Sequence, residues 1–367
     1  MFINQNKIRN HLYFMKLALE QARINLGNTG TNPSVGCVIT KNNSLVSAGY
    51  TGINGRPHAE INAINFTDTK LHNAILYATL EPCSHFGKTP PCIHSIAKKK
   101  IKKVFFSIKD PDSRSFDKST YFFKKKGINV NKGIYSEKIY KFYKSYYKFK
   151  LNEFPFVTAK LAISKDFYTI NKRKKWITNT FSRGRVHMMR SENNCILTSS
   201  NTVIKDNPRL TCRIKGLEHH SPYRIVLDKR LRAPINSHVF SDSNKNKTIV
   251  FYNIPNIKKI NTLKKMKIKF FRVPLDLSGD IDLKKALIKI KKMGFYRVFL
   301  ECGKSLTSNF LKENLVDEFK LFVSNKKLLN NGRGNLKSYF KSFLKNKKKN
   351  EEIVNLFGDK LITYKIK

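Results

Sequence analysis

Acidic residues are scarce in this chain, and a long apolar run is missing altogether. Only 25 Asp and Glu residues stand against 72 Lys and Arg residues, which gives a formal net charge of +47. No stretch approaches the roughly 20 apolar residues that span a bilayer, and no apolar block follows the charges of the opening segment. We therefore expect a cytoplasmic protein without an export signal and without a membrane partner.

The sequence also lacks a G-x-G-x-x-G loop after any predicted strand, an internal repeat and a Gly/Ser linker. The glycine loop that marks the common βαβ dinucleotide fold is therefore absent from the sequence.

The positive charge raises nucleic acid as a partner. The lysines, however, are scattered through every segment together with many Asn, Ile and Phe residues. This pattern predicts solvated basic faces and nonspecific attraction to polyanions, with no specific nucleic-acid site. A small phosphorylated substrate would be attracted as well.

Length and patterning predict two α/β domains. A chain of 367 residues with 40% hydrophobic content exceeds what one core usually serves. Strand and helix patterns alternate in both halves, and Pro155 favours a boundary after an aromatic helix, so we divide the chain into residues 1–150 and 151–367. The predicted helices lie at 11–24, from about 92, and near 136–150, with another opened by "HAE" (58–60). The predicted strands lie at 35–40, 44–50, 74–80, 103–108 and 156–163, and near 195–198, 223–227, 248–252 and 296–300.

Two short segments predict a catalytic metal site. "PHAEINAI" (57–64) places His58 and Glu60 at a helix start, and "TLEPCSHFGKTPPC" (79–92) adds Cys83 and Cys92 just after the next strand. One imidazole and two thiolates leave a fourth position open for water, as catalytic zinc requires. Glu60, which is not a ligand, can carry the proton from that water to a leaving amine.

Each of these residues has a simpler interpretation when taken alone. A histidine after proline is usually a surface residue at a helix start, and a single cysteine is usually buried as an apolar residue. Their combination is what indicates a zinc-dependent deaminase. Eight residues separate the two cysteines, whereas nucleobase deaminases commonly have C-x-x-C.

Three motifs together resemble the deaminase half of the bifunctional deaminase/reductase family of riboflavin biosynthesis, whose cysteines are also nine positions apart. They are "TNPSVGCVI" (31–39), "GRPHAE" (55–60) and "TLEPCSHFGKTPPC". The second half carries motifs that resemble the reductase half and follow its order: "KLAISKD" (160–166), "WIT" (176–178), "NTVIKDNPRLTCR" (201–213), "YRIVLDKRLRAP" (223–234), "ECG" (301–303) and "LVDEF" (315–319).

The resemblance implies a cytidine-deaminase-like domain followed by a dihydrofolate-reductase-like domain. It implies that a diaminopyrimidine bearing a ribose phosphate is deaminated with Zn²⁺ and then reduced by NADPH to a ribityl phosphate. It also suggests a homodimer joined through the reductase sheets.

The resemblance further implies residue roles. In the first half, Asn32 would contact the pyrimidine, and Lys88 and the loop around His85 would meet the phosphate. In the second half, the dinucleotide would be bound by Ala162, Trp176, Thr202, Asp206 and the run from Gly303, and the substrate by Lys174, Arg190, Leu210, Arg213 and Glu301. From the residues alone, Asn32 fits a turn, Trp176 a core or a domain contact, and the two arginines a solvated face.

Several positions depart from the family pattern. Phe167 replaces a glycine, Lys174 stands where a small polar residue is expected, and Cys302 stands where a small residue lets the backbone approach the cofactor. The segment after "KDPD" (109–112) lacks the usual glycines.

We expect both activities. The alternatives are a deaminase with a lapsed reductase domain, a nucleic-acid deaminase acting on tRNA, and a noncatalytic nucleic-acid-binding protein with a structural zinc.

Overall fold

A computed structural model describes residues 2–367, with side chains described for residues 9–340 and 342–367. Its internal contacts divide the chain into two compact units, Met1–Asn152 and Glu153–Lys367. Each unit is built from alternating strands and helices, which confirms the predicted α/β class. Within the described residues, no helix is both long and apolar enough to cross a membrane.

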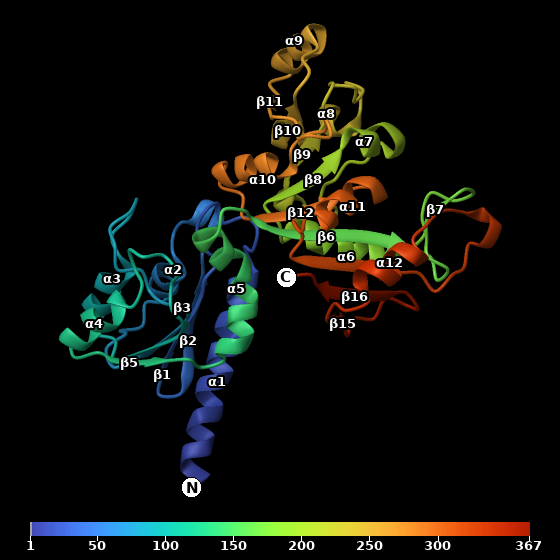
Figure 1. Ribbon diagram of the computed structural model, residues 1–367. Helices are drawn as coiled ribbons and strands as arrows, with labels where there is room; N and C mark the ends of the chain where they lie inside the picture. Colours follow the sequence, from blue (N-terminus) through green and yellow to red (C-terminus); the bar gives the residue numbers. More distant parts are fainter. Residues whose placement is uncertain (1) are drawn as a thin grey trace. The chain divides into compact units, whose positions relative to one another are not determined.

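The first unit is a five-stranded sheet with helices on both faces (Figure 1). The strand order is β2-β1-β3-β4-β5, antiparallel across β2, β1 and β3 and parallel from β3 onward. Its elements are α1 (Phe2–Arg23), β1 (Gly36–Lys41), β2 (Ser44–Tyr50), α2 (Ala59–Asn65), β3 (Ile75–Leu80), α3 (Cys92–Lys98), β4 (Lys103–Ile108), α4 (Lys118–Lys125), β5 (Asn129–Lys132) and α5 (Ser136–Leu151).

Two glycines let helices approach this sheet closely. A Cβ atom on Gly36 would lie 1.8 Å from the carbonyl oxygen of Ala18 in α1. A Cβ atom on Gly49 would lie 2.4 Å from the backbone of both Ala59 and Ala63 in α2. Only glycine fits at either contact, so Gly49 sets the position of α2, the helix that follows His58.

The second unit is a nine-stranded, mostly parallel sheet with the order β11-β10-β9-β8-β12-β6-β13-β16-β15, accompanied by a two-stranded ribbon of β7 and β14. Only β16 and β15 run antiparallel to their neighbours in the large sheet. The elements are β6 (Phe156–Ile163), β7 (Tyr168–Asn171), α6 (Thr180–Ser191), β8 (Cys195–Ser199), α7 (Ser200–Asp206), β9 (Tyr223–Leu227), α8 (His238–Ser241), β10 (Thr248–Tyr252), α9 (Ile257–Lys265), β11 (Lys269–Arg272), α10 (Leu283–Lys292), β12 (Arg297–Glu301), α11 (Lys304–Lys312), β13 (Glu318–Val323), β14 (Gly332–Asn335), α12 (Lys337–Leu344), β15 (Lys349–Glu351) and β16 (Lys360–Lys365).

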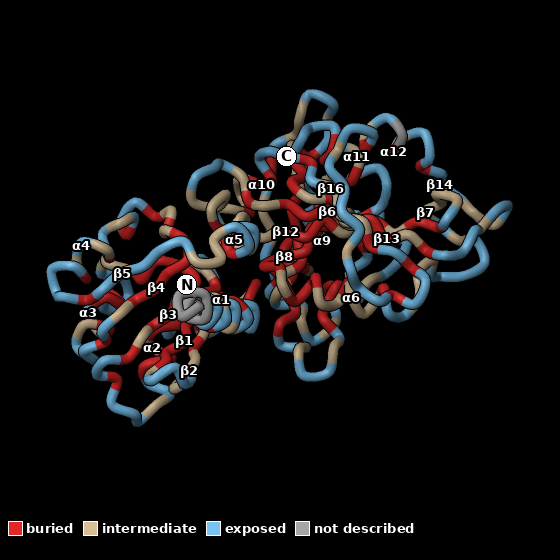
Figure 2. The backbone as a smooth tube through the Cα atoms, turned by 90° about the horizontal axis from the view of Figure 1, so that it is seen from below, coloured by how far each residue is buried: buried red, intermediate tan, exposed pale blue. Residues whose placement is uncertain are grey.

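The large sheet carries an apolar core on each face. Side chains of α10, α11 and α12 pack on one face, and side chains of α6, α7, α8 and α9 pack on the other. The central strands β6, β8 and β12 are therefore buried from both sides (Figure 2). This explains their mainly apolar sequences, which are typical of parallel strands covered by helices on both faces.

Candidate active sites

His58, Cys83 and Cys92 converge in the first unit. His58 is the N-cap of α2, Cys83 lies three residues beyond the end of β3, and Cys92 begins α3. His58 Nδ1 lies 3.2 Å from Cys92 Sγ and 3.4 Å from Cys83 Sγ, and the three ligand atoms lie within 4.8 Å of one another. Tetrahedral zinc holds such ligands about 3.6 Å apart, so both the spacing and the one-nitrogen, two-sulfur donor set fit zinc.

The charges at this cluster also suit a metal ion. A hydrogen bond with Cys92 and the proximity of His58 outweigh burial and lower the pKa of the Cys83 thiol to about 4. The backbone N–H of Cys92 also donates to Cys83 Sγ at 3.3 Å. The neighbouring Cys83 and burial raise the pKa of Cys92. Two adjacent thiolates repel each other, and a divalent cation between them would remove that cost.

Glu60 lies beside the cluster on the first turn of α2. Its side chain is 3% exposed, and burial raises the pKa of its carboxyl group to about 7. The neighbouring His58 and the Cys92 side chain oppose this rise in the pKa. A buried carboxyl group near three candidate metal ligands is suited to proton transfer.

The other predicted residues of this unit surround the cluster less closely. The Asn32 side-chain amide donates to the carbonyl oxygen of Gly55 at 2.9 Å, three residues before His58. His85 is half-buried, and its Nδ1 lies 2.8 Å from the Ser115 hydroxyl, while Lys88 is exposed. Arg56, which the sequence did not single out, contacts both His58 Nε2 and the Thr89 hydroxyl at 2.5 Å.

The second unit contains a cavity of about 1430 Å³. This volume exceeds that of common small-ligand pockets and leaves room for a dinucleotide together with a substrate. All ten residues predicted for this half line it: Ala162, Lys174, Trp176, Arg190, Thr202, Asp206, Leu210, Arg213, Glu301 and Gly303. Cations also line the wall, and they suit a ligand that carries several phosphates: Lys205, Arg230, Arg232, Lys304 and Arg333.

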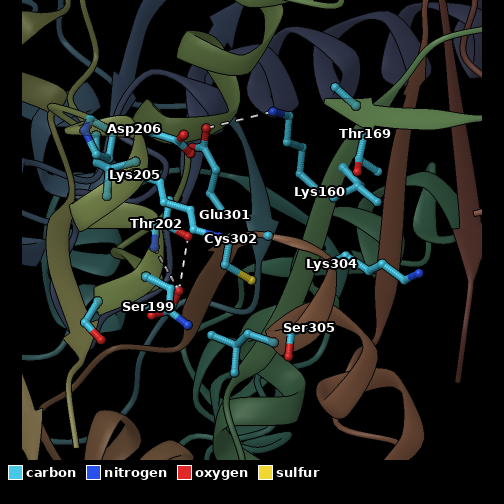
Figure 3. Close-up of a pocket in the computed structure, with 18 of the residues that line it drawn as sticks. Lys160, Thr169, Ser199, Thr202, Lys205, Asp206, Glu301, Cys302, Lys304 and Ser305 are labelled. Carbon is cyan, nitrogen blue, oxygen red and sulfur yellow. Dashed lines mark hydrogen bonds and ion pairs between the residues drawn. The ribbon is translucent and has the colours of Figure 1, made fainter. Parts of the chain in front are cut away.

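A buried charge cluster forms one side of this cavity. Arg190 donates to both carboxylate oxygens of Glu301 at 2.9 and 2.8 Å, and to the carbonyl oxygen of Thr211 at 3.0 Å. Lys160 on β6 points toward Glu301 at the end of β12, with 3.9 Å between Lys160 Nζ and Glu301 Oε1 (Figure 3). Burial raises the pKa of Glu301, but the charges of Arg190 and Lys160 overcome it and lower the pKa to about 2.

Lys160 is a site residue that the sequence analysis missed. It interrupts the apolar strand "FVTAKLAI", and burial lowers its pKa despite the nearby Glu301. A lysine inside an otherwise apolar strand is rarely even partly buried without a role, and this was the available signal. It was obscured by the abundance of lysine elsewhere in the chain.

The positions that depart from the family pattern are accommodated in the structure. Phe167 has φ +72°, so it adopts the left-handed conformation that we expected a bulky residue to disfavour. The Cys302 sulfur is buried and lies 3.3 Å from the Thr307 hydroxyl. Trp176 is 53% exposed, which excludes a core role, and Lys175 and Arg183 lie over its ring. Lys174 is exposed at the cavity wall.

Comparisons with known proteins cover both units. The family model "Cytidine and deoxycytidylate deaminase zinc-binding region" matches residues 8–108, and the model "RibD C-terminal domain" matches residues 155–338. A riboflavin biosynthesis protein RibD from Aquifex aeolicus is 35% identical over 357 residues, which is 96% of this chain and 97% of that protein.

Two solved structures are similar along nearly the whole chain. RibD from Acinetobacter baumannii has a TM-score of 0.84 at 28% identity. The diaminohydroxyphosphoribosylaminopyrimidine deaminase/5-amino-6-(5-phosphoribosylamino)uracil reductase from Thermotoga maritima has a TM-score of 0.82 at 29% identity. Each comparison covers 98% of this chain and 99% of the other.

Proposed function

Because this chain belongs to the RibD family of riboflavin biosynthesis proteins, we propose that its two catalytic domains act in turn on one phosphorylated pyrimidine. The enzyme is bifunctional, with a zinc-binding deaminase domain and an NADPH-dependent reductase domain. The Thermotoga maritima relative is named for diaminohydroxyphosphoribosylaminopyrimidine and 5-amino-6-(5-phosphoribosylamino)uracil, and we infer the same two substrates here. Residues 1–150 would carry the first activity and residues 151–367 the second.

In the deaminase domain, His58, Cys83 and Cys92 would hold zinc. The observation that carries this proposal is the convergence of these three side chains within 4.8 Å. Zinc would supply a bound water that is acidic enough to react at neutral pH. Glu60 would hold and move the proton that the ring amine needs in order to leave as ammonia. Asn32 would orient the pyrimidine, and Lys88 with the loop around His85 would hold the phosphate.

In the reductase domain, the cavity would bind cofactor and substrate side by side. Ala162, Trp176, Thr202, Asp206 and Gly303 would hold NADPH, which supplies the hydride. Lys174, Arg190, Leu210, Arg213 and Glu301 would face the ribosyl phosphate, which arginine binds through paired donors. Reduction also consumes a proton, and Lys160 is the partly buried cation beside Glu301 that would deliver it.

A two-stage assay tests the proposal. The zinc-loaded protein is given the diaminopyrimidine ribosyl phosphate, ammonia is measured without NADPH, and NADPH absorbance is then followed after its addition. We expect both signals in the wild type. Removal of zinc with a chelator should abolish ammonia release and leave NADPH oxidation with pre-deaminated substrate intact, and added zinc should restore ammonia release.

Glu60→Gln is the decisive variant. Loss of a general acid–base group should lower ammonia release by about 100-fold or more, while NADPH oxidation with pre-deaminated substrate stays unchanged. Glu20→Gln, which alters an exposed glutamate of the same unit, is the matched control. Ammonia release by Glu60→Gln at the wild-type rate would overturn the assignment. Absence of NADPH oxidation in the wild type would indicate a lapsed reductase.

The resemblance to the family also supports a homodimer joined through the reductase sheets. Light scattering on the purified protein tests this, and a monomeric mass at working concentration would contradict it. We propose no specific nucleic-acid partner, because both candidate sites are built for a small phosphorylated substrate.

A further inference from the structure

Glu81 is a buried carboxylate that the zinc chemistry does not use. It directly follows β3, is two residues before Cys83, and is 2% exposed. Within the described part of the chain, no lysine, arginine or histidine forms an ion pair with it. A buried carboxylate without a cation must be satisfied by hydrogen-bond donors, and the identity of these donors indicates its role.

All the donors come from one segment, residues 109–119. The backbone N–H groups of Asp110 and Asp117 donate to Glu81 Oε2 at 3.3 and 3.0 Å. The Ser119 hydroxyl and N–H donate to Glu81 Oε1 at 2.7 and 3.3 Å. Two of these N–H groups lie at the start of α4, where the Asp117 side chain makes no capping bond. Glu81 therefore caps α4 from outside the helix and complements its dipole.

The same segment touches the residues next to the zinc ligand. The Ser115 hydroxyl lies 2.8 Å from His85 Nδ1, and the Ser84 hydroxyl donates to the Arg114 carbonyl oxygen at 3.4 Å. Residues 83–85 are thus held in two ways. They follow Glu81 closely in the chain, and they contact residues 109–119, which Glu81 binds. Asp117, within this segment, has φ +58°, a conformation that costs a residue other than glycine and needs support.

We infer that Glu81 is a positioning residue of the deaminase. It fixes the wall formed by residues 109–119 against residues 83–85, so that His85 and the segment after Cys83 keep their orientation toward the substrate. This inference rests on the proposed deaminase function. The bonds to Glu81 also explain how residues 109–119, which contain no glycine, keep their conformation beside the deaminase site.

Part of the wall is held independently of Glu81. Asp112 pairs with Arg114 and with Lys150 of α5, and the Tyr146 hydroxyl donates to Asp110. Loss of the Glu81 charge should therefore loosen the wall without unfolding the unit. The amide of glutamine keeps the shape of the side chain, but its NH₂ group cannot accept from a backbone N–H.

The test is steady-state kinetics of Glu81→Gln on the zinc-loaded full chain. We expect kcat/KM for deamination to fall by about 10- to 100-fold, mainly through KM, as for other groups that orient a metal site from outside. Zinc content and NADPH oxidation should stay at wild-type values. Ser107→Ala is the matched control, because it removes another side-chain bond of this sheet, from the Ser107 hydroxyl to the Ile134 carbonyl oxygen, which involves neither Glu81 nor residues 109–119.

A double-mutant cycle separates positioning from general stability. Ser115→Ala cuts the contact with His85, so its effect and that of Glu81→Gln should not add if Glu81 acts through this contact. If Glu81→Gln proves insoluble, Ser119→Ala removes one donor only and should raise KM in the same direction. The inference would be overturned if kcat/KM for deamination by Glu81→Gln lay within twofold of that of the Ser107→Ala control. It would also be overturned if the effects of Glu81→Gln and Ser115→Ala were strictly additive. A wild type that releases no ammonia would instead defeat the proposed function.

Discussion

Phe167 adopts a backbone conformation that is normally reserved for glycine. Its φ is +72°, its N–H donates to the Ser164 carbonyl oxygen, and its carbonyl oxygen accepts from Leu336 N–H. Its ring packs, partly buried, against the core of the second unit. The left-handed conformation costs such a residue about 1–2 kcal/mol, so these contacts must offset the strain.

The balance between strain and packing at this residue can be measured. Phe167→Ala loses the packing and keeps the strain, whereas Phe167→Gly loses the packing and relieves the strain. We expect the free energy of unfolding of the glycine variant to be about 1 kcal/mol higher than that of the alanine variant. At most positions alanine is instead the more stable of the two. Denaturant unfolding of both variants checks this. An alanine variant as stable as the glycine variant would show that Phe167 is unstrained.

His187 makes the stability of the second unit depend on pH. It lies at the cavity, with Nδ1 3.0 Å from the Thr211 carbonyl oxygen and 3.2 Å from the Arg213 N–H. Burial, and then the charges of Arg190 and Arg213, lower its pKa to about 4, against a smaller opposing effect of Glu301. Between about pH 6.5 and 4 the unfolded chain therefore binds a proton that the folded chain does not.

The stability that His187 contributes is complete above about pH 6.5 and is lost as the pH falls toward 4. We expect the unfolding temperature of the wild type to fall more steeply over this range than that of His187→Gln, which has no group to titrate there. Differential scanning fluorimetry across the range makes the comparison. Parallel curves for the two proteins would contradict the prediction.

At the scale of elements, the contact between α2 and β2 positions the deaminase site. Gly49 lies directly under Ala59 and Ala63, so an added methyl group must displace the helix that carries Glu60. Gly49→Ala should destabilise the first unit by about 1–3 kcal/mol and sharply reduce ammonia release, with NADPH oxidation retained. Gly184→Ala, a helical position with open space around it, should be neutral or stabilising. Normal deamination by Gly49→Ala would show that α2 tolerates the shift.

Elements with a strong local pattern could be predicted from the sequence. The strands at 103–108 and 156–163 have the predicted bounds, and those near 223–227 and 248–252 agree with their predicted positions, because each is rich in apolar residues. Helix starts at Ala59 and Cys92 also agree, so the metal cluster was predictable from spacing alone.

Other features depend on contacts between distant segments. The ribbon of β7 and β14 pairs residues more than 160 positions apart, and each strand has only 4 residues. The four bonds to Glu81 join the residue after β3 to a segment 29 to 38 positions later. Neither leaves a periodic signal in the sequence, since each depends on how the whole unit packs.

At the scale of the whole molecule, the net charge of +47 acts on every anion in solution. Cations cover solvated faces of both units, and the cavity and the zinc site occupy a small part of that surface. Attraction to nucleic acid should therefore be a property of the surface rather than of either site.

This view predicts RNA binding that is strong at low salt and lost at high salt. A protein that contacts 6–10 phosphates loses about 10³- to 10⁵-fold in affinity between roughly 50 and 200 mM salt, because bound counterions are released on association. Fluorescence anisotropy with a labelled RNA homopolymer should show this slope equally for the wild type and for Glu60→Gln, since Glu60 is buried. Binding that persists at high salt, together with deamination of RNA bases by the wild type alone, would instead establish a nucleic-acid deaminase and displace the small-molecule substrate.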